Sequence, residues 1–305
     1  RMEKFEITIL GCGSALPTMK HYNSSHVVNI REKLFMIDCG EGTQRQFRRC
    51  KLRFSKLNHI FISHMHGDHF FGLIGLISTL GLLGRTATLH IYGPKDIEDI
   101  LTPLLKYFCN GMSYNIEIHS VDTKSFNLVY EDRSVSIYAI PLKHRIACCG
   151  YLFKEKEGLR HIIPEKIKAF EIPTSQINNI KAGLDYICPD GEIIKNALLT
   201  TPPSHARSYA YCSDTIFMQK NAEYLKNVDV LYHEATFCEE DKKFCKQTYH
   251  STAKQAAELA LLANVGKLII GHFSSRYDNE EILLEESKCV FHNTILAEEG
   301  LRITI

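Results

Sequence analysis

Short runs of β-branched, aliphatic and aromatic residues alternate with helical patterns along this 305-residue chain. The runs at 126–130 and 134–140 lie too close together for a purely parallel sheet with helical crossovers. We therefore predict an α/β fold in which two mixed β-sheets are sandwiched between helices. Helical patterns occupy 43–49, 70–82, 95–107, 251–263 and 279–287. The predicted strands are FEITIL, HVVNI, LFMID, HIFIS, ATLHIYG, YNIEIHS, FNLVY, SVSIYAI, GYLF, YAYCS, DVLYHE and KLIIGH.

The composition is that of an ordinary folded domain, with 45% hydrophobic and 23% charged residues. No apolar stretch approaches the roughly 18 residues that suggest a membrane span, and RMEKFEITIL lacks the features of a signal peptide. We therefore predict no membrane association and a cytoplasmic location. The eleven cysteines form no CxxC pair, which favours reduced, buried thiols over disulfides. Since the net charge is only +1, any contact with a polyanion must be local.

We predict that residues 1–305 form a single domain. Within it, one segment differs in composition from the rest of the chain. Residues 154–195 are rich in charge, contain Pro164, Pro173 and Pro189, and show only two short helical stretches. We predict an inserted arm that projects from the core. An ordinary surface excursion without a task of its own fits the same pattern.

The stretch SHMHGDHFFG, residues 63–72, concentrates metal-binding side chains directly after the strand-like HIFI. His64 and His66 alternate along an extended segment, so both can face one ion. A tight turn at Gly67 redirects Asp68 and His69 toward a second ion. Mixed imidazole and carboxylate ligation suits zinc best, and manganese or iron is chemically acceptable. A coincidental polar turn is the competing interpretation.

Two ions need about seven protein contacts, so about three further ligands must come from elsewhere in the chain. His144, Asp214 and His272 each follow an apolar strand, where α/β folds present functional residues. Taken singly, each has an ordinary structural role open to it: a capping aspartate, or a histidine bonded to a neighbouring backbone group. Together they complete a set of seven candidates.

These motifs resemble those of the metallo-β-lactamase-fold hydrolases, and among them the ribonuclease Z family of tRNA 3′-processing endonucleases. The broader resemblance rests on HMHGDH, on the three later ligand candidates and on LFMIDCGEGTQRQ. The narrower one rests on GCGSALPT, NSS at 23–25, CGEGTQRQF, YCSDT, HEAT at 233–236, HST at 250–252 and GHFSSRY. The motifs span residues 10–277, nearly the whole chain.

The resemblance implies an αββα sandwich with a flexible arm, two Zn²⁺ ions per chain and a homodimer. One zinc would be held by His64, His66 and His144, and the other by Asp68, His69 and His272, with Asp214 bridging the pair. Asp38 would support the ligand loop from outside. A carboxylate that only caps the GEGTQ helix is an equal alternative for Asp38.

The implied reaction is endonucleolytic cleavage of precursor tRNA after the discriminator nucleotide. A metal-bridging hydroxide would attack the phosphodiester, leaving a tRNA 3′-hydroxyl and a 5′-phosphorylated trailer. Asp68 would accept the proton of the water, while His250, held by Glu234, would protonate the leaving oxygen. From the residues alone, a solvent-facing His250 at the start of a helix competes with that role, because Ser251 or Thr252 could cap the helix.

The sequence constrains the identity of the substrate less than it constrains the metal site. Residues 45–56 hold six arginines or lysines and no acid, which suits phosphate contact, and a solvated helical face competes with this interpretation. The arm corresponds in position to the family's tRNA-binding arm, but its basic residues alternate with glutamates. The alternatives for the whole chain are a phosphodiesterase for small esters or cyclic nucleotides, an RNA exonuclease, and a binding module without catalysis.

Overall fold

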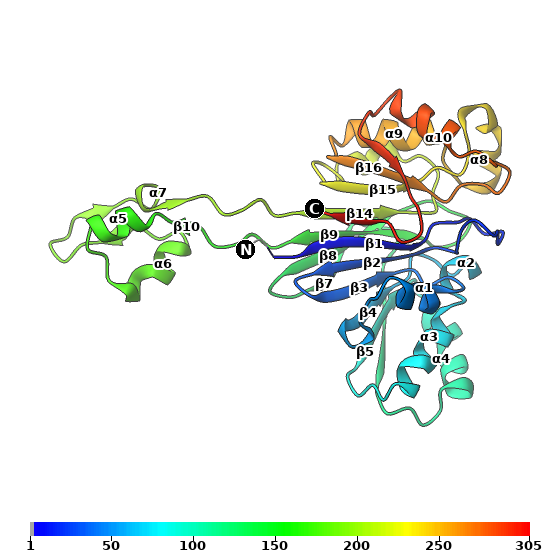
Figure 1. Ribbon diagram of the computed structural model, residues 1–305, viewed down its shortest axis with the longest axis horizontal. Helices are drawn as coiled ribbons and strands as arrows, with labels where there is room; N and C mark the ends of the chain where they lie inside the picture. Colours follow the sequence, from blue (N-terminus) through cyan, green and yellow to red (C-terminus); the bar gives the residue numbers. More distant parts are fainter. Residues whose placement is uncertain (1–2) are drawn as a thin grey trace. The chain divides into compact units, whose positions relative to one another are not determined.

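The computed structural model describes residues 3–305 and contains two seven-stranded mixed sheets (Figure 1). The first sheet has the order β18 (Arg302–Thr304), β1 (Phe5–Gly11), β2 (Ser25–Ile30), β3 (Lys33–Ile37), β4 (Leu57–Phe61), β5 (Leu89–Gly93) and β6 (Ile116–Ser120). The second has the order β17 (Thr294–Leu296), β16 (Lys267–Gly271), β15 (Val230–Glu234), β14 (Ser208–Cys212), β9 (Cys149–Glu155), β8 (Val135–Pro141) and β7 (Asn127–Glu131).

Helices cover the outer face of each sheet, as Figure 1 shows. The first sheet carries α1 (Thr43–Arg49), η1 (Phe54–Lys56), α2 (Gly67–Phe70), α3 (Leu73–Leu82) and α4 (Ile97–Phe108). The second sheet is accompanied by η3 (Gln219–Ala222), η4 (Glu239–Asp241), α8 (Lys243–Thr248), α9 (Ala253–Leu262) and α10 (Glu281–Lys288). The predicted αββα sandwich is thereby confirmed.

Side-chain alternation along each strand produces three apolar layers. In β8, for example, Val135, Ile137 and Ala139 point into the core between the sheets, whereas Tyr138 and Ile140 join the layer beneath the helices of the second sheet. Because both faces of the central strands are covered, these strands are continuously apolar. This explains why their sequences are easy to recognise.

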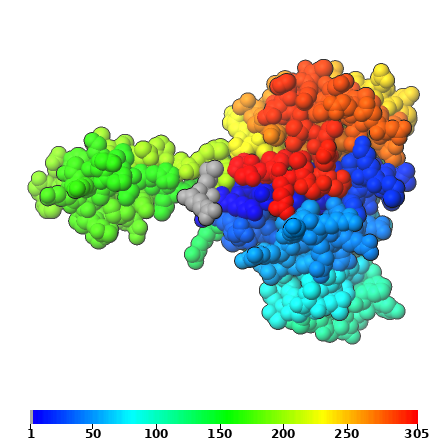
Figure 2. Space-filling model, viewed as in Figure 1, coloured from blue at the N-terminus to red at the C-terminus, as the bar shows by residue number. Residues whose placement is uncertain are grey.

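The last strands of the two sheets escaped prediction because they are short and are defined by their partners. β18 pairs antiparallel with β1, and β17 pairs parallel with β16. In Figure 2 the red C-terminal residues lie directly against the blue N-terminal ones. Helix α8 was also missed, since it has only six residues.

The contacts within the chain separate a second compact unit, Glu155–Ala206, from the unit formed by residues up to Lys154 together with Arg207–Ile305. It contains β10 (His161–Ile162), α5 (Pro164–Ala169), η2 (Thr174–Gln176), α6 (Ile177–Lys181), β11 (Tyr186–Ile187), β12 (Ile193–Ile194), α7 (Asn196–Leu199) and β13 (Thr200–Thr201).

This unit has its own small core, and it extends past the predicted arm boundary at residue 195. Leu199 packs with Ile180 and Tyr186 in that core. The Asn196 side chain donates hydrogen bonds of 2.8 Å to the carbonyls of Ile180 and Leu184. Helix α7 and strand β13, which follow residue 195, belong to this compact unit.

All eleven cysteines are free thiols and most are buried, as predicted from the sequence. Among residues 3–305, no helix has both the length and the apolar character that a bilayer crossing requires.

A buried ion-pair network anchors the loop between β1 and β2 to the C-terminal part of the chain. The ring of His21 lies 2.6 Å from a carboxylate oxygen of Glu280 and 2.8 Å from one of Glu299. Cys12 and Lys20 complete the surroundings of this network, Cys12 by a contact to Glu299 and Lys20 by an ion pair with Glu280. Burial opposes a charge on His21, but the two carboxylates outweigh burial and raise its pKa to about 9.

We therefore predict a pH-dependent stability gap between the native chain and His21→Gln. A histidine whose pKa rises on folding stabilises fully below its unfolded value, near 6.5, and loses that contribution as the pH passes through about 9. Urea unfolding at pH 6 should show the variant less stable by on the order of 2 kcal/mol, because solvent screens part of the attraction. The gap should shrink at pH 10. A gap that is constant with pH would contradict the charged state of His21.

Candidate metal centre and catalytic cleft

The candidate site residues gather at one edge of the sandwich because they follow the carboxyl ends of strands from both sheets. β3 and β4 are parallel neighbours in the first sheet, and β14, β15 and β16 are parallel neighbours in the second. The carboxyl ends of parallel strands meet at a common edge. Asp38 follows β3, the HMHGDH turn follows β4, Asp214 follows β14 and His272 follows β16.

The first group of possible ligands consists of His64, His66, His144 and Asp214, whose ligand atoms lie within 4.8 Å of one another. His144 Nε2 is 3.1 Å from His66 Nδ1. Asp214 Oδ2 is 3.7 Å from His64 Nε2 and 3.8 Å from His144 Nε2. These atoms converge from β4, β8 and β14.

The second group consists of Asp68, His69, His272 and the same Asp214. His69 Nε2 lies 3.2 Å from Asp68 Oδ2 and 3.4 Å from Asp214 Oδ1. His272 Nε2 lies 3.5 Å from Asp68 Oδ2 and 3.2 Å from Asp214 Oδ1. Asp214 therefore presents one carboxylate oxygen to each group. The structure brings together all seven residues that the sequence nominated.

Several ligand atoms that point toward the centre of these groups are buried and make no hydrogen bond with one another. Among the residues that the structure describes, His64 Nε2, His69 Nε2, His272 Nε2 and Asp68 Oδ2 are buried and make no hydrogen bond. Such orphaned atoms are costly unless a cation satisfies them. Four ligands about 2.0–2.1 Å from a tetrahedral zinc ion lie roughly 3.3 Å apart, which matches the spacings here. The residues thus fit two zinc-sized ions.

Partners on the outer side fix which ring nitrogen faces the centre. His64 Nδ1 contacts Ser63 Oγ at 2.9 Å, and His272 Nδ1 contacts Thr236 Oγ1 at 3.1 Å. The backbone carbonyl of Tyr249 accepts from His144 Nδ1 at 3.0 Å. Such outer hydrogen bonds orient metal-binding histidines. Ser63, Thr236 and Tyr249 were not singled out from the sequence; of the three, only Ser63 adjoins the ligand motif, and Thr236 lies within HEAT.

Asp38 is one of these outer partners and does not cap α1. It is fully buried and accepts from His69 Nδ1 at 2.6 Å, Tyr211 Oη at 2.8 Å and the Ser63 backbone N–H at 2.7 Å. Asp38 and His272 both have left-handed backbone conformations, with φ of 58° and 61°. Backbone strain of this kind is concentrated at functional sites, where the surroundings enforce it.

His250, which is partly buried, pairs with the fully buried Glu234 beside the ligand groups. His250 Nδ1 lies 2.6 Å from Glu234 Oε1, and its ring is within 5.3 Å of the rings of His144 and His272. Glu234 also accepts from the backbone N–H groups of Thr215, Thr236 and Ser251. The solvent-facing alternative for His250 is therefore wrong. Thr252, one of the two residues expected to cap the helix, starts α9 through a capping box with Gln255.

The electrostatics of the pair favour a charged imidazole. Burial opposes that charge, but the carboxylate of Glu234 outweighs burial and raises the pKa of His250 to about 9. Burial likewise opposes the charge of Glu234, and His250 reverses the effect and lowers its pKa. Histidine held in this way carries a proton at neutral pH.

A cleft of about 550 Å³ opens over both ligand groups and the His250 side chain. The loop that follows β1 forms part of its wall, because the backbone N–H of His272 donates to the carbonyl of Cys12 at 2.8 Å. Arg145, which is exposed, and Phe71 also line the cleft. The sequence did not single out either residue, since nothing local marks a surface arginine or phenylalanine as part of a site.

The comparisons with known proteins decide the family. The chain is 57% identical to ribonuclease Z from Bacteroides fragilis strain YCH46 over 304 residues, covering 100% of both chains. It is 55% identical to ribonuclease Z from Bacteroides thetaiotaomicron over 304 residues, covering 100% of this chain and 96% of the relative. The chain belongs to the ribonuclease Z family. It is accordingly a hydrolase.

Solved structures support the fold of this ribonuclease Z family member. Human tRNase Z, short form, superposes with a TM-score of 0.71 at 23% identity, covering 98% of this chain and 99% of the human one. At that identity the likeness speaks for the metallo-β-lactamase fold alone. The family model described as Anti-Pycsar protein Apyc1 matches residues 5–142, the part that contains β1 to β8 and the HMHGDH turn.

Proposed function

We propose that this chain is a zinc-dependent endoribonuclease that removes the 3′ trailer of precursor tRNA. It cuts after the discriminator nucleotide and leaves a tRNA 3′-hydroxyl and a 5′-phosphorylated trailer. The observation that carries the proposal is the sharing of Asp214 between two ligand groups beside the His250 and Glu234 pair. Membership of the ribonuclease Z family supports the choice of substrate.

The first ion would be held by His64, His66 and His144 and the second by Asp68, His69 and His272, with Asp214 serving both. When bound, such ions supply a water nucleophile at neutral pH and neutralise charge on a phosphate. Asp68 lines the cleft, where its carboxylate is placed to accept the proton that the attacking water loses. The ligand histidines hold their positions through their outer hydrogen bonds.

His250 completes the reaction as the acid. Water adds to phosphorus as the bond from phosphorus to the ribose O3′ breaks, and O3′ then requires a proton. Glu234 occupies Nδ1 of His250, so Nε2 is the ring nitrogen left to deliver that proton. The pair thus couples a charged imidazole to the leaving group.

Two variants separate binding of the ions from acid catalysis. We predict that His66→Ala loses turnover together with metal, because a ligand is missing. His250→Ala should slow cleavage of precursor tRNA by about 10²- to 10⁴-fold, the usual contribution of a general acid, while keeping its metal. Metal content by mass spectrometry and single-turnover cleavage of end-labelled precursor tRNA measure both effects. Loss of metal from His250→Ala would refute the acid role.

We propose that tRNA contacts the chain in two places apart from the cleft. All six basic residues of segment 45–56 are exposed on α1, η1 and the turn between them, where they can contact phosphates. The unit Glu155–Ala206 is the second candidate, since a substrate no larger than a small ester would give it nothing to bind.

Deletion of that unit tests the substrate. With residues 155–206 replaced by a short Gly-Ser linker, we predict that cleavage of precursor tRNA falls by roughly 10- to 100-fold, the effect of losing a few phosphate contacts. Hydrolysis of bis(p-nitrophenyl) phosphate should be retained. Unchanged tRNA cleavage would contradict the proposed contact between this unit and tRNA.

We further propose a cytoplasmic homodimer. The free cysteines suit a reducing compartment. Exposed apolar side chains gather on α3, α4 and the residue after α3, a surface that a second copy would cover. They are Leu82, Leu83, Tyr107 and Phe108.

Charge placed on this surface should dissociate the dimer. We predict that Leu82→Asp with Phe108→Asp converts a dimer to a monomer in light scattering after size exclusion, because two buried carboxylates cannot be solvated at the interface. Leu261→Asp, at an exposed position on α9, is the matched control and should stay dimeric. A native chain that is monomeric would contradict the proposal.

A further inference from the structure

Phe71 is an exposed aromatic residue beside the ligand groups. It follows α2 directly, the residue is 72% exposed, and its backbone N–H donates to the carbonyl of Gly67 at 2.8 Å. The ring lies over Gly67 so closely that a Cβ at that glycine would come within 2.1 Å of it. The ring is therefore seated on the turn that carries His66 and Asp68.

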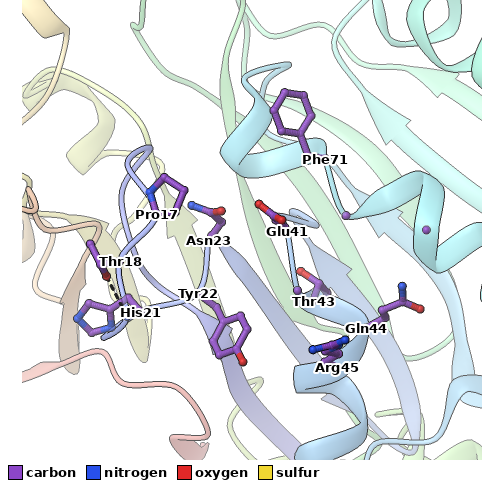
Figure 3. Close-up of a pocket in the computed structure, with 13 residues that line it drawn as sticks. Pro17, Thr18, His21, Tyr22, Asn23, Glu41, Thr43, Gln44, Arg45 and Phe71 are labelled. Carbon is purple, nitrogen blue, oxygen red and sulfur yellow. Dashed lines mark hydrogen bonds between the residues drawn. The ribbon is translucent and has the colours of Figure 1, made fainter.

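Phe71 also stands between two cavities. One is the catalytic cleft of about 550 Å³, and the other is a neighbouring cavity of about 570 Å³, and Phe71 lines both. Figure 3 shows the second cavity, with Phe71 on one side and Tyr22 and Arg45 on the other. Gln44 and Glu41 lie along the wall of this cavity (Figure 3).

Folding gives little reason for such an exposed ring, since large apolar side chains stabilise the fold when they are buried. Binding of unpaired nucleotides would explain the exposed ring, because their bases stack on aromatic faces. The second cavity adds what a further nucleotide needs. Tyr22 and Arg45 offer an aromatic ring and a cation, while Gln44 and Glu41 offer donors and acceptors for a base edge.

We propose that Phe71 stacks on the unpaired nucleobase next to the cleaved phosphodiester, and that the cavity bounded by Tyr22 and Arg45 receives the next nucleotide along the RNA. This inference rests on the proposed function and names a substrate subsite within it. Phe71 thereby aligns the strand across the ligand groups, so that the scissile phosphate rather than a neighbour lies in the cleft.

A substrate series tests the stacking directly. Precursor tRNAs carrying a single abasic nucleotide at each position flanking the cut are compared in single-turnover assays with the native chain and Phe71→Ala. On the intact substrate the variant should lose about 5- to 150-fold in kcat/KM, the range measured for one base stacked on an aromatic ring. On the substrate that lacks the stacked base, the same substitution should reduce kcat/KM only slightly, because the stacking interaction is already absent.

Companion variants test whether the aromatic face itself is required. Phe71→Trp should keep most of the activity and Phe71→Leu should not, since leucine is apolar but has no aromatic face. Leu261→Ala, an exposed apolar position on α9, is the control and should behave as the native chain. Metal content is measured for every Phe71 variant, because the ring also rests on Gly67.

Three results would overturn the subsite. They are an equal penalty of Phe71→Ala on every abasic substrate, activity of Phe71→Leu equal to that of Phe71→Trp, and a loss of metal that accounts for the effect. Failure of the native chain to cut intact precursor tRNA at its 3′ side is a separate result, which would refute the proposed function itself.

Discussion

The candidate metal centre depends on a fold that holds several imidazole nitrogens and carboxylate oxygens close together without hydrogen bonds between them. Atoms of this kind prefer water or a cation, so the fold must supply the free energy that keeps them together. Four ligand histidines make a hydrogen bond on the side of the ring that faces away from the centre. The pairs are His64 with Ser63, His69 with Asp38, His144 with the carbonyl of Tyr249 and His272 with Thr236. The outer partners are therefore as much a part of the centre as the ligands.

Those outer bonds explain why the site needs both sheets. Asp38 follows β3 of the first sheet, yet it accepts from Tyr211 in β14 of the second. Asp214 comes from the second sheet and lies among the histidines that follow β4 of the first. Because the apolar core between the sheets fixes their separation, it also fixes the spacing of the ligand groups.

The sequence predicted the central strands and the seven ligand candidates because both signals are local. Strands buried on two faces are continuously apolar, and HMHGDH carries its own spacing. The edge strands β17 and β18, the helix α8 and the true extent of the unit Glu155–Ala206 were not predictable, because pairing partners and a separate small core define them. Phe71 and the outer partners Ser63, Thr236 and Tyr249 were missed because no local pattern distinguishes them from other polar or surface residues.

By itself the sequence determined which chemical groups stand at the end of each strand, since that follows from neighbouring residues. Tertiary structure alone decided that His250 is paired with Glu234 rather than exposed, that Asp38 holds His69 rather than a helix, and which nitrogen each ring presents. Those outcomes depend on contacts between residues far apart in the chain. Their formation is governed by the packing of two sheets, and no local pattern encodes it.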